Sequence, residues 1–423
     1  MTTRTLRLFS SILLCFALHG CGGGGSDAPT ASPSAPPAAS TPVQASAPAT
    51  ASAPVAASNA VAQSTTPNVQ PIQVTKIATG TRNMLQTSVT LCVPGTNTCQ
   101  TIDNIQVDTG SQGLRVLASA LDPAIALPLV KAGASGAALA ECSVFGSGYT
   151  WGAVRQADVR LAGQLASSIS VQSISDSAVP ATAADCSQSG LPMLTASSLR
   201  GNGILGVGPF VADCGGGCAA SAMPRWYYAC ASGACSASAL AADQQVTNPI
   251  ARFAADNNGV LIELPAVPPE GASAVAGTMT FGIGSQANNA LGSATVLKSN
   301  SITGYVTTSF SANQYASSFI DSGSNGLFFP STTLKSCGAW YCPATPQSFS
   351  ATLRSTSGVT ADVSFSVAAS TGLLTSGNNA FSNLAGPANG FFDWGLPFFY
   401  GRRVFTALEG RATPAGNGPY YAF

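Results

Sequence analysis

Short runs of alternating apolar and polar residues dominate the chain, and many of them are rich in β-branched side chains. Alternation with a period of two is typical of strands that bury one face, so these runs predict β-strands. Glycine, asparagine and serine separate the runs, and the 44 glycines favour tight turns. We therefore expect an all-β, mainly antiparallel protein. The clearest runs are 87–92, 154–161, 169–171, 278–283 and 305–310.

Helical patterns are short and rare. Residues 249–256 begin with proline and end before Asn-Asn-Gly, which are start and stop signals of a short helix. A second helical turn is expected at 194–199. The stretch 211–247 is rich in Gly, Ala, Ser and Cys, and it predicts an insertion held by disulfides rather than part of a sheet.

The N-terminal segment has the pattern of an export signal. Two arginines precede a short apolar stretch, and Leu-His-Gly-Cys follows at 18–21. This tetrapeptide resembles a bacterial lipobox, in which the cysteine is lipidated and becomes the new N-terminus. We expect a signal peptide over 1–20, lipidation of Cys21, and a flexible Gly/Ala/Ser/Pro tether over 21–70. The alternative is an ordinary secretory signal with a chance cysteine.

The residue after the predicted lipidation site bears on localisation. Gly22 stands where an aspartate would mark retention in the inner membrane. By resemblance to lipoprotein sorting rules, we expect a protein of the bacterial cell envelope that is anchored in the outer membrane. The pattern leaves open whether the protein faces the periplasm or the cell surface.

Charge and histidine content exclude several function classes. Only 8% of the residues are charged and the formal net charge is zero, so nucleic acid is not an expected partner. Apart from the signal, no apolar run could span a bilayer, so membrane contact is expected only through the lipid. The only histidine, His19, lies in the predicted signal, which excludes Ser-His-Asp catalysis and a His-ligated zinc in the mature chain. We expect no cofactor, no metal and a monomer.

Ten cysteines follow Cys21, and an even number in an exported chain predicts a disulfide framework. A turn between two β-prone runs separates Cys92 from Cys99, so we expect these two to pair. The other expected pairs are Cys337–Cys342 and, by elimination, Cys142–Cys186. Local and nested pairings both stay open for Cys214, Cys218, Cys230 and Cys235. A four-cysteine metal site is the rival there, and the spacing and the oxidising compartment argue against it.

One four-residue pattern occurs twice, as Asp108-Thr109-Gly110-Ser111 and Asp321-Ser322-Gly323-Ser324. Each copy follows a β-prone approach and leads into an apolar segment. The glycine allows backbone angles closed to other residues, and the serine hydroxyl can bond to a carboxylate oxygen. A pair of such loops would suit a two-carboxylate active site, so we predict that Asp108 and Asp321 are catalytic. The alternative is that both are structural turns.

Further landmarks appear in the order expected of a pepsin-like aspartic protease, and the chain resembles that family. A hairpin leads into the first Asp motif, Phe145-Gly146-Ser147-Gly148 resembles the start of the flap, and Gly203 to Gly208 resembles the Gly element behind the first Asp loop. Residues 395–405 resemble the Gly element and final strand of the second lobe. The chain also resembles a bacterial lipoprotein family of unknown function.

The protease resemblance implies a bilobal protein with a central cleft. The first lobe would span 71–285, with the Cys-rich insertion at about 211–247, and the second would span 286–423. In that family, residues at the positions of Ser111 and Ser324 hold the outer carboxylate oxygens. Residues at the positions of Thr109 and Ser322 reach across to the other lobe.

The flap region departs from the family pattern. Phe145 occupies the position of the usual tyrosine, and Arg115 replaces the tryptophan that would bond to it. Tyr149 or Trp151 could substitute for that tyrosine, and the alternative is that both are packing or surface aromatics. Asp393-Trp394 also stands where two apolar residues would precede Gly395.

These observations predict an exported, lipid-anchored aspartic endopeptidase with a peptide or protein substrate in the interlobe cleft. The rival is a non-catalytic envelope lipoprotein that keeps the fold to bind a peptide or protein partner. The two Asp motifs favour the enzyme, and the altered flap favours the binder. A carboxylate-pair glycosidase is a third alternative. Five other carboxylates are expected to be solvated surface groups: Asp158, Asp185, Asp362, Glu263 and Glu409.

Overall fold

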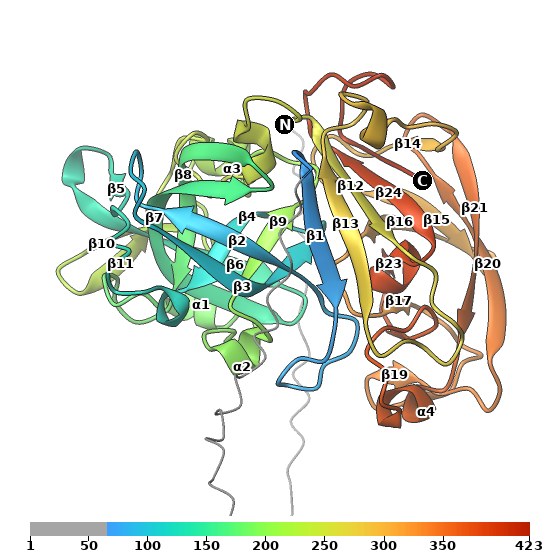
Figure 1. The fold of residues 1–423 in the computed structure, drawn as a ribbon. Helices are drawn as coiled ribbons and strands as arrows, with labels where there is room; N and C mark the ends of the chain where they lie inside the picture. The colour runs from blue at the N-terminus through green and yellow to red at the C-terminus, as the bar shows by residue number, and fades with distance from the viewer. Residues whose placement is uncertain (1–65) are drawn as a thin grey trace, which may run out of the picture. The chain divides into compact units, whose positions relative to one another are not determined.

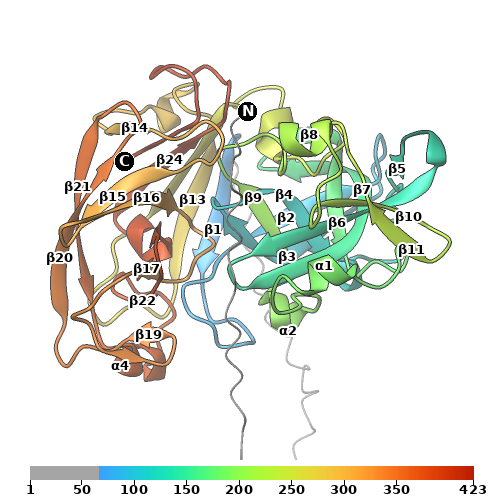
Figure 2. The ribbon, with the colours of Figure 1, turned by 180° about the vertical axis from the view of Figure 1, so that it is seen from behind.

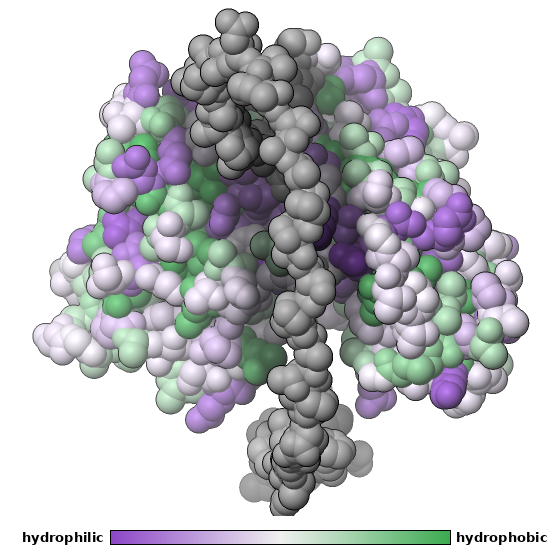
Figure 3. Space-filling view, turned by 60° about the horizontal axis from the view of Figure 1, so that its bottom comes forward, coloured by the Kyte–Doolittle hydropathy of each residue, from purple (hydrophilic) through white to green (hydrophobic). Residues whose placement is uncertain are grey.

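The computed structural model describes residues 66–423. The predictions on the signal peptide, the lipidated Cys21 and the tether up to residue 65 lie outside the described residues. Strands predominate within the described part and helices are short, which confirms the all-β expectation (Figure 1). Between residues 66 and 423, no helix combines the length and apolar character needed to cross a membrane. Hydrophilic and hydrophobic residues are interspersed over the face drawn in Figure 3.

Most strands belong to one 16-stranded sheet. Its strands in chain order are β1 (Val69–Val74), β2 (Leu85–Cys92), β3 (Cys99–Asp108), β4 (Gln112–Leu117), β5 (Lys131–Ala132), β6 (Ala137–Phe145), β7 (Gly148–Leu161), β8 (Gln164–Ile174), β9 (Gly203–Val207), β10 (Tyr227–Ala231), β11 (Ala234–Ala237), β12 (Gly259–Leu264), β13 (Val275–Phe281), β14 (Val296–Lys298), β24 (Arg402–Ala407) and β25 (Tyr420–Ala422).

Part of this sheet closes into a barrel. The strand order β7-β8-β4-β9-β3-β2 returns to its start because β2 also pairs with β7, with Thr90 opposite Arg160. Inside this ring, β9 runs parallel to β3 and antiparallel to β4. β3, which ends at Asp108, therefore has paired strands along both edges, and the end of that strand is held in place.

The sheet continues from the barrel into strands from both ends of the described chain. The order β2-β1-β13-β12-β24-β25-β14 places β1 beside β13, and the late strands β24 and β25 beside β12 and β14. Figures 1 and 2 show β1, β12, β13 and β24 side by side between the barrel and the remaining strands. Early and late segments are thus joined by continuous backbone hydrogen bonds.

A separate 7-stranded sheet holds most of the C-terminal strands, in the order β21-β20-β15-β16-β23-β17-β22. Their bounds are β15 (Val306–Phe310), β16 (Asn313–Ile320), β17 (Leu327–Phe329), β20 (Gln347–Arg354), β21 (Thr360–Val367), β22 (Ala385–Pro387) and β23 (Phe392–Trp394). A two-stranded sheet, β18 (Ser336–Cys337) and β19 (Trp340–Tyr341), lies beside it. The core of the 7-stranded sheet is aromatic. The ring of Phe392 stacks on the rings of Phe329 and Trp394, at centroid distances of 5.0 Å and 4.4 Å.

The helices are α1 (Ala184–Ser187), α2 (Ala196–Leu199), α3 (Gly216–Ala220) and α4 (Ser370–Thr375), with 3₁₀ turns η1 (Ala118–Ala120), η2 (Gly133–Ser135), η3 (Pro249–Arg252), η4 (Ala287–Asn289) and η5 (Leu396–Phe399). The turn predicted at 194–199 is present as α2, where Thr195 caps the helix. The helix predicted over 249–256 is shorter than expected. It is the 3₁₀ turn η3, capped by Asn248, and the backbone is extended at Phe253.

The prediction that 211–247 stands outside the sheets is wrong in part. The hairpin β10–β11 extends the large sheet by pairing with β6, with Tyr227 opposite Glu141. The physical reason is burial, since Tyr227 and Tyr228 are 0% and 3% exposed. Burial of these two large aromatic side chains stabilises the packing of the hairpin on the barrel, although the residues around them are small.

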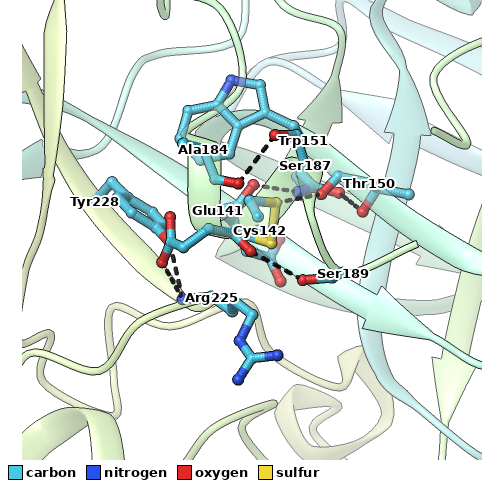
Figure 4. Close-up of a disulfide and its surroundings, with 12 residues drawn as sticks. Glu141, Cys142, Thr150, Trp151, Ala184, Ser187, Ser189, Arg225 and Tyr228 are labelled. Carbon is cyan, nitrogen blue, oxygen red and sulfur yellow. Dashed lines mark hydrogen bonds between the residues drawn. A yellow bond between two sulfur atoms is a disulfide. The ribbon is translucent and has the colours of Figure 1, made fainter. Parts of the chain in front are cut away.

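Five disulfides bridge all ten predicted cysteines, and four of them close loops of seven residues or fewer. The pairs are Cys92–Cys99, Cys142–Cys186, Cys214–Cys218, Cys230–Cys235 and Cys337–Cys342. The three predicted pairs are confirmed, and the four cysteines left open pair locally. Figure 4 shows the Cys142–Cys186 bridge, which ties β6 to α1 beside Trp151 and Tyr228.

Candidate active site

The loop after β3 places Asp108 in a tight turn that holds both of its carboxylate oxygens. The backbone N–H of Gly110 donates to Asp108 Oδ1 at 2.7 Å, and the Ser111 hydroxyl donates to Oδ2 at 2.5 Å. The Asp108 side chain is buried, with 6% of the residue exposed. Two donors from one short loop hold the carboxylate in a single orientation.

The loop after β16 repeats this arrangement around Asp321. The N–H of Gly323 donates to Asp321 Oδ1 at 2.7 Å, and the Ser324 hydroxyl donates to Oδ2 at 2.7 Å. The backbone N–H of Asp321 itself bonds to Trp394 O at the end of β23. The same residue types in the same order therefore make the same contacts in the two loops.

Thr109 and Ser322 tie the two loops to each other. The N–H of Thr109 donates to Ser322 Oγ at 3.1 Å, and the N–H of Ser322 donates to Thr109 Oγ1 at 2.9 Å. Each hydroxyl then donates across to the opposite strand, that of Thr109 to Ile320 O at 2.9 Å and that of Ser322 to Val107 O at 2.8 Å. Both residues are fully buried. This reciprocal network sets the separation of the two aspartates.

The two glycines allow each loop to approach the opposite aspartate. A Cβ atom at Gly110 would lie 2.7 Å from Asp321 Cγ, and one at Gly323 would lie 2.5 Å from Asp108 Oδ1. No side chain fits at either position without moving a carboxylate. The structure therefore brings together all eight residues predicted in the two motifs.

Burial raises the pKa of Asp321 well above its ordinary value, and the charges of Asp108 and then of Asp393 raise it further. A hydrogen bond with Asp108 acts in the same direction, and the Ser324 hydroxyl acts against it. The pair therefore retains a proton at a pH where an exposed aspartate would be ionised. One carboxyl can act as an acid while its neighbour acts as a base.

Two adjoining cavities, of about 460 Å³ and 330 Å³, open onto the aspartates. Both are lined by Asp108, Phe145, Gly146, Asp321, Ser324, Phe391 and Asp393. The larger one is mostly apolar away from the aspartates and includes Met193, Leu199, Ile204, Phe328 and Trp340. A substrate could contact both carboxyls while it places apolar groups in this cavity.

The turn of the hairpin β6–β7 lies at the two cavities that open onto the aspartates. This turn, at Phe145 and Gly146, lines both cavities as predicted. Tyr149 and Trp151 line neither cavity and are 5% and 3% exposed. Trp151 donates its Nε1–H to Pro180 O at 2.9 Å and packs edge-on against Tyr228. Tyr149 and Trp151 belong to the same buried apolar cluster, so both make packing contacts.

A buried ionic cluster lies beside the smaller cavity. Arg115 donates through Nη2 to Glu141 at 2.5 Å and to Asp213 at 3.0 Å, and through Nη1 to Gln112 O at 2.6 Å. Tyr227 donates its hydroxyl to the other oxygen of Asp213. Burial raises the pKa of Glu141 well above its ordinary value, although the charge of Arg115 opposes this shift. The cluster links the Asp108 loop to β6 of the hairpin.

Sequence reasoning missed three acidic residues around the site. Glu141 and Asp213 carry no motif, and their pairing with Arg115 depends on the folded barrel. Asp393 attracted notice only as an irregularity before Gly395, yet it lines both cavities. The one available signal was a pair of charged residues, Arg115 and Asp393, at positions where the family resemblance implies apolar ones.

All five carboxylates predicted to be solvated accept a hydrogen bond from the protein, and Asp158 is the one that is buried. Asp158 is 5% exposed and accepts hydrogen bonds from the N–H groups of Gly95 and Ser168. Asp185 accepts the hydroxyl of Tyr228 at 2.6 Å. The surface prediction is wrong for Asp158, because its carboxylate accepts N–H groups from the nearby turn at Ser168 and from the turn at Gly95, which is distant in the sequence.

Residues 64–423 match the family described as "Protein of unknown function (DUF3443)", and the chain belongs to this family. No curated protein matches the chain. The description of the family names no activity.

Proposed function

We propose that this protein is an aspartic endopeptidase with a bilobal, pepsin-like architecture, in which Asp108 and Asp321 activate a water molecule. The observation that carries the proposal is the reciprocal pairing of Thr109 with Ser322, which holds two buried carboxyls against each other. An ordinary pair of turns has no need for four buried hydrogen bonds between them. The cavities above the carboxyls would receive a peptide segment.

The sheet arrangement supports the architecture. The barrel strands deliver Asp108, and the separate 7-stranded sheet delivers Asp321. β9 runs parallel to β3, with Gly206 opposite Asp108. β23 likewise runs parallel to β16, with Trp394 opposite Ile320. The strand that leads into each Asp loop thus has a parallel neighbour. On this basis, we propose lobes at 71–285 and 286–423, with the cleft between them.

The proposed mechanism divides the work between the two carboxyls. Burial and the charges of Asp108 and Asp393 raise the pKa of Asp321, so we assign the proton that the pair shares to Asp321. Asp108 takes a proton from water, whose oxygen then attacks the peptide carbonyl carbon, while Asp321 donates its proton to the carbonyl oxygen. Collapse of the tetrahedral intermediate breaks the C–N bond. The leaving nitrogen takes the proton that Asp108 holds, and one hydroxyl of the intermediate returns a proton to Asp321 as it becomes the carbonyl of the product acid.

The location is part of the same proposal. Five disulfides in a chain of this size favour an oxidising compartment. Together with the lipobox-like sequence at 18–21, they support an exported protein that is attached to the outer membrane through a lipid on Cys21.

A non-catalytic peptide-binding lipoprotein is the second candidate, and one observation favours it. The family tyrosine and its tryptophan partner are both replaced, by Phe145 and Arg115, and Arg115 is committed to Glu141 and Asp213. The flap therefore lacks a hydroxyl that could bond to substrate at this position. A binding protein would require the cavities but not the acid–base chemistry of Asp108 and Asp321.

The test is cleavage of a mixed peptide pool between about pH 3 and pH 8 by the full chain in mild detergent. Wild type should cleave best at acidic pH, because the dyad needs one proton, and Asp108→Asn and Asp321→Asn should each lower the rate by at least about 10³-fold. Asp362→Asn, at an exposed residue that lines neither cavity, is the matched control. Folded wild type that cleaves no peptide at any pH would support the binder instead.

A further inference from the structure

Asp393 is a third carboxyl at the dyad that the mechanism above does not use. It lies in β23 between Phe392 and Trp394, whose side chains enter the aromatic core. Because neighbouring residues of a strand point to opposite faces, Asp393 turns away from that core. It is 4% exposed and lines both cavities together with Asp108 and Asp321.

The Asp393 carboxyl lacks a full set of partners. Its Oδ1 has no hydrogen-bond partner, although it is buried. The neighbouring Ser324 hydroxyl already donates to Asp321 Oδ2 at 2.7 Å. Among residues 66–423, Asp393 forms no ion pair. Buried polar atoms are almost always satisfied, so this oxygen indicates a partner that the chain does not itself supply.

No cation of the cavity linings neutralises this cluster of carboxyls. Arg115 faces the smaller cavity but is bound by Glu141 and Asp213, and Arg200 lines the larger cavity as an exposed residue. The groups that face Asp393 are thus Asp108, Asp321 and the shared Ser324 hydroxyl. Three buried carboxyls around one point favour an occupant with positive charge.

We propose that Asp393 is a specificity-determining residue that selects substrates with a lysine or arginine side chain beside the scissile bond. This inference rests on the proposed endopeptidase function. The ammonium or guanidinium group would donate to the unpartnered Oδ1 and offset the charge of the dyad. Burial and the charge of Asp108 raise the pKa of Asp393, and a bound cation would act in the opposite direction and favour its ionised form.

The experiment compares peptides that differ at one residue beside the scissile bond: lysine, arginine, citrulline or norleucine. Citrulline keeps the shape of arginine without the charge, and norleucine approximates the lysine stem. For the full wild-type chain we expect kcat/KM to be about tenfold or more higher for the two cationic peptides, as one charge-assisted hydrogen bond implies. Asp393→Asn and Asp393→Leu should reduce this ratio to about one.

The controls separate selectivity from effects on the dyad. Asp393→Glu keeps the charge and should retain the preference, and Asp362→Asn, an exposed residue that lines neither cavity, should match wild type. Equal rates of wild type on all four peptides would overturn the inference. A preference for the cationic peptides that persists in both Asp393→Asn and Asp393→Leu would overturn it as well. The inference would also fail if these variants lowered kcat/KM by the same factor for all four peptides.

A binding measurement separates this inference from the endopeptidase proposal. The same four peptides are prepared with a reduced, uncleavable bond, and their Kd values are measured for wild type and both Asp393 variants. Cleavage without a charge preference contradicts the inference alone. Absence of cleavage contradicts the endopeptidase, and a tenfold tighter Kd for the cationic peptides that is lost in Asp393→Asn would still support Asp393 as the selective group.

Discussion

The loop that carries Asp108 and the loop that carries Asp321 make the same hydrogen bonds, but they pack against different surroundings. Beside the first lies the buried ionic cluster of Arg115, Glu141 and Asp213. Beside the second lies an aromatic core, in which Trp394 donates its Nε1–H to Thr308 and stacks on Phe392. The geometry at the carboxyls is thus set by a few residues within the loops, while the side chains that pack around the two loops differ.

This difference has an electrostatic consequence. The aromatic side removes Asp321 from water and adds the charge of Asp393 nearby, and both effects raise the pKa of Asp321. In the ionic cluster, one cation, Arg115, faces the two carboxyls of Glu141 and Asp213, and Arg115 also donates to Gln112 O, directly after the Asp108 loop. Two loops of equal geometry can therefore divide acid and base roles through their surroundings, which is how pairs of carboxyls acquire different functions.

The largest effect is expected where the ionic cluster loses its only cation. Arg115→Met leaves Glu141 and Asp213 buried and uncompensated, which should lower the free energy of unfolding by about 3–5 kcal/mol at neutral pH. The loss should be smaller at pH 4, because protonation of the carboxyls removes the unpaired charge. Urea unfolding monitored by tryptophan fluorescence at both pH values measures it.

Arg403→Met is the matched control for that variant. Arg403 pairs with Glu263 at 2.7 Å, but the two side chains are 43% and 35% exposed, so removal should cost about 0–1 kcal/mol. Equal losses in the two variants would mean that burial of the cluster beside Asp108 does not matter. A loss at Arg115→Met that does not depend on pH would argue against uncompensated carboxylates as its cause.

A smaller effect is expected in the network that the two loops share. Thr109→Val and Ser322→Ala each remove a buried hydroxyl and leave one N–H and one carbonyl without their partner, so each should cost about 1–3 kcal/mol. The two losses should be similar despite the different surroundings, and the double variant should lose less than their sum because the bonds are shared. Chemical unfolding gives all three values.

The control here is Thr90→Val, whose hydroxyl bond to Thr101 is exposed and which should change stability by no more than about 0.5 kcal/mol. Strictly additive losses in the double variant would show that the two loops are independent. If only one of the two single variants lost stability, the residues around the loops, and not the reciprocal hydrogen bonds, would hold the carboxyls in place.

The sequence predicts the loops better than their surroundings, and the reason is the range of the contacts. The Asp motifs and the short disulfide loops are local patterns, so residue order alone identifies Asp108, Asp321 and pairs such as Cys92–Cys99. The partners of Arg115 come from β6 and from the segment before α3, which only the folded barrel brings together. Alternation of apolar and polar residues predicts strands, but it does not predict which distant residues will pair with a buried charge.

A further prediction concerns the pH dependence of stability at Asp321. Burial and the charge of Asp108 raise its pKa in the folded state, so the folded protein holds this proton more tightly than the unfolded chain does. As the pH rises from about 4, the ordinary pKa of an unfolded aspartate, through the folded pKa, wild type must lose stability. Asp321→Asn cannot ionise, so its free energy of unfolding should exceed that of wild type more at pH 7 than at pH 4. Thr90→Val, which removes no ionisable group, should follow the wild-type profile, and an Asp321→Asn profile parallel to both would refute the assignment of the shared proton to this side of the pair.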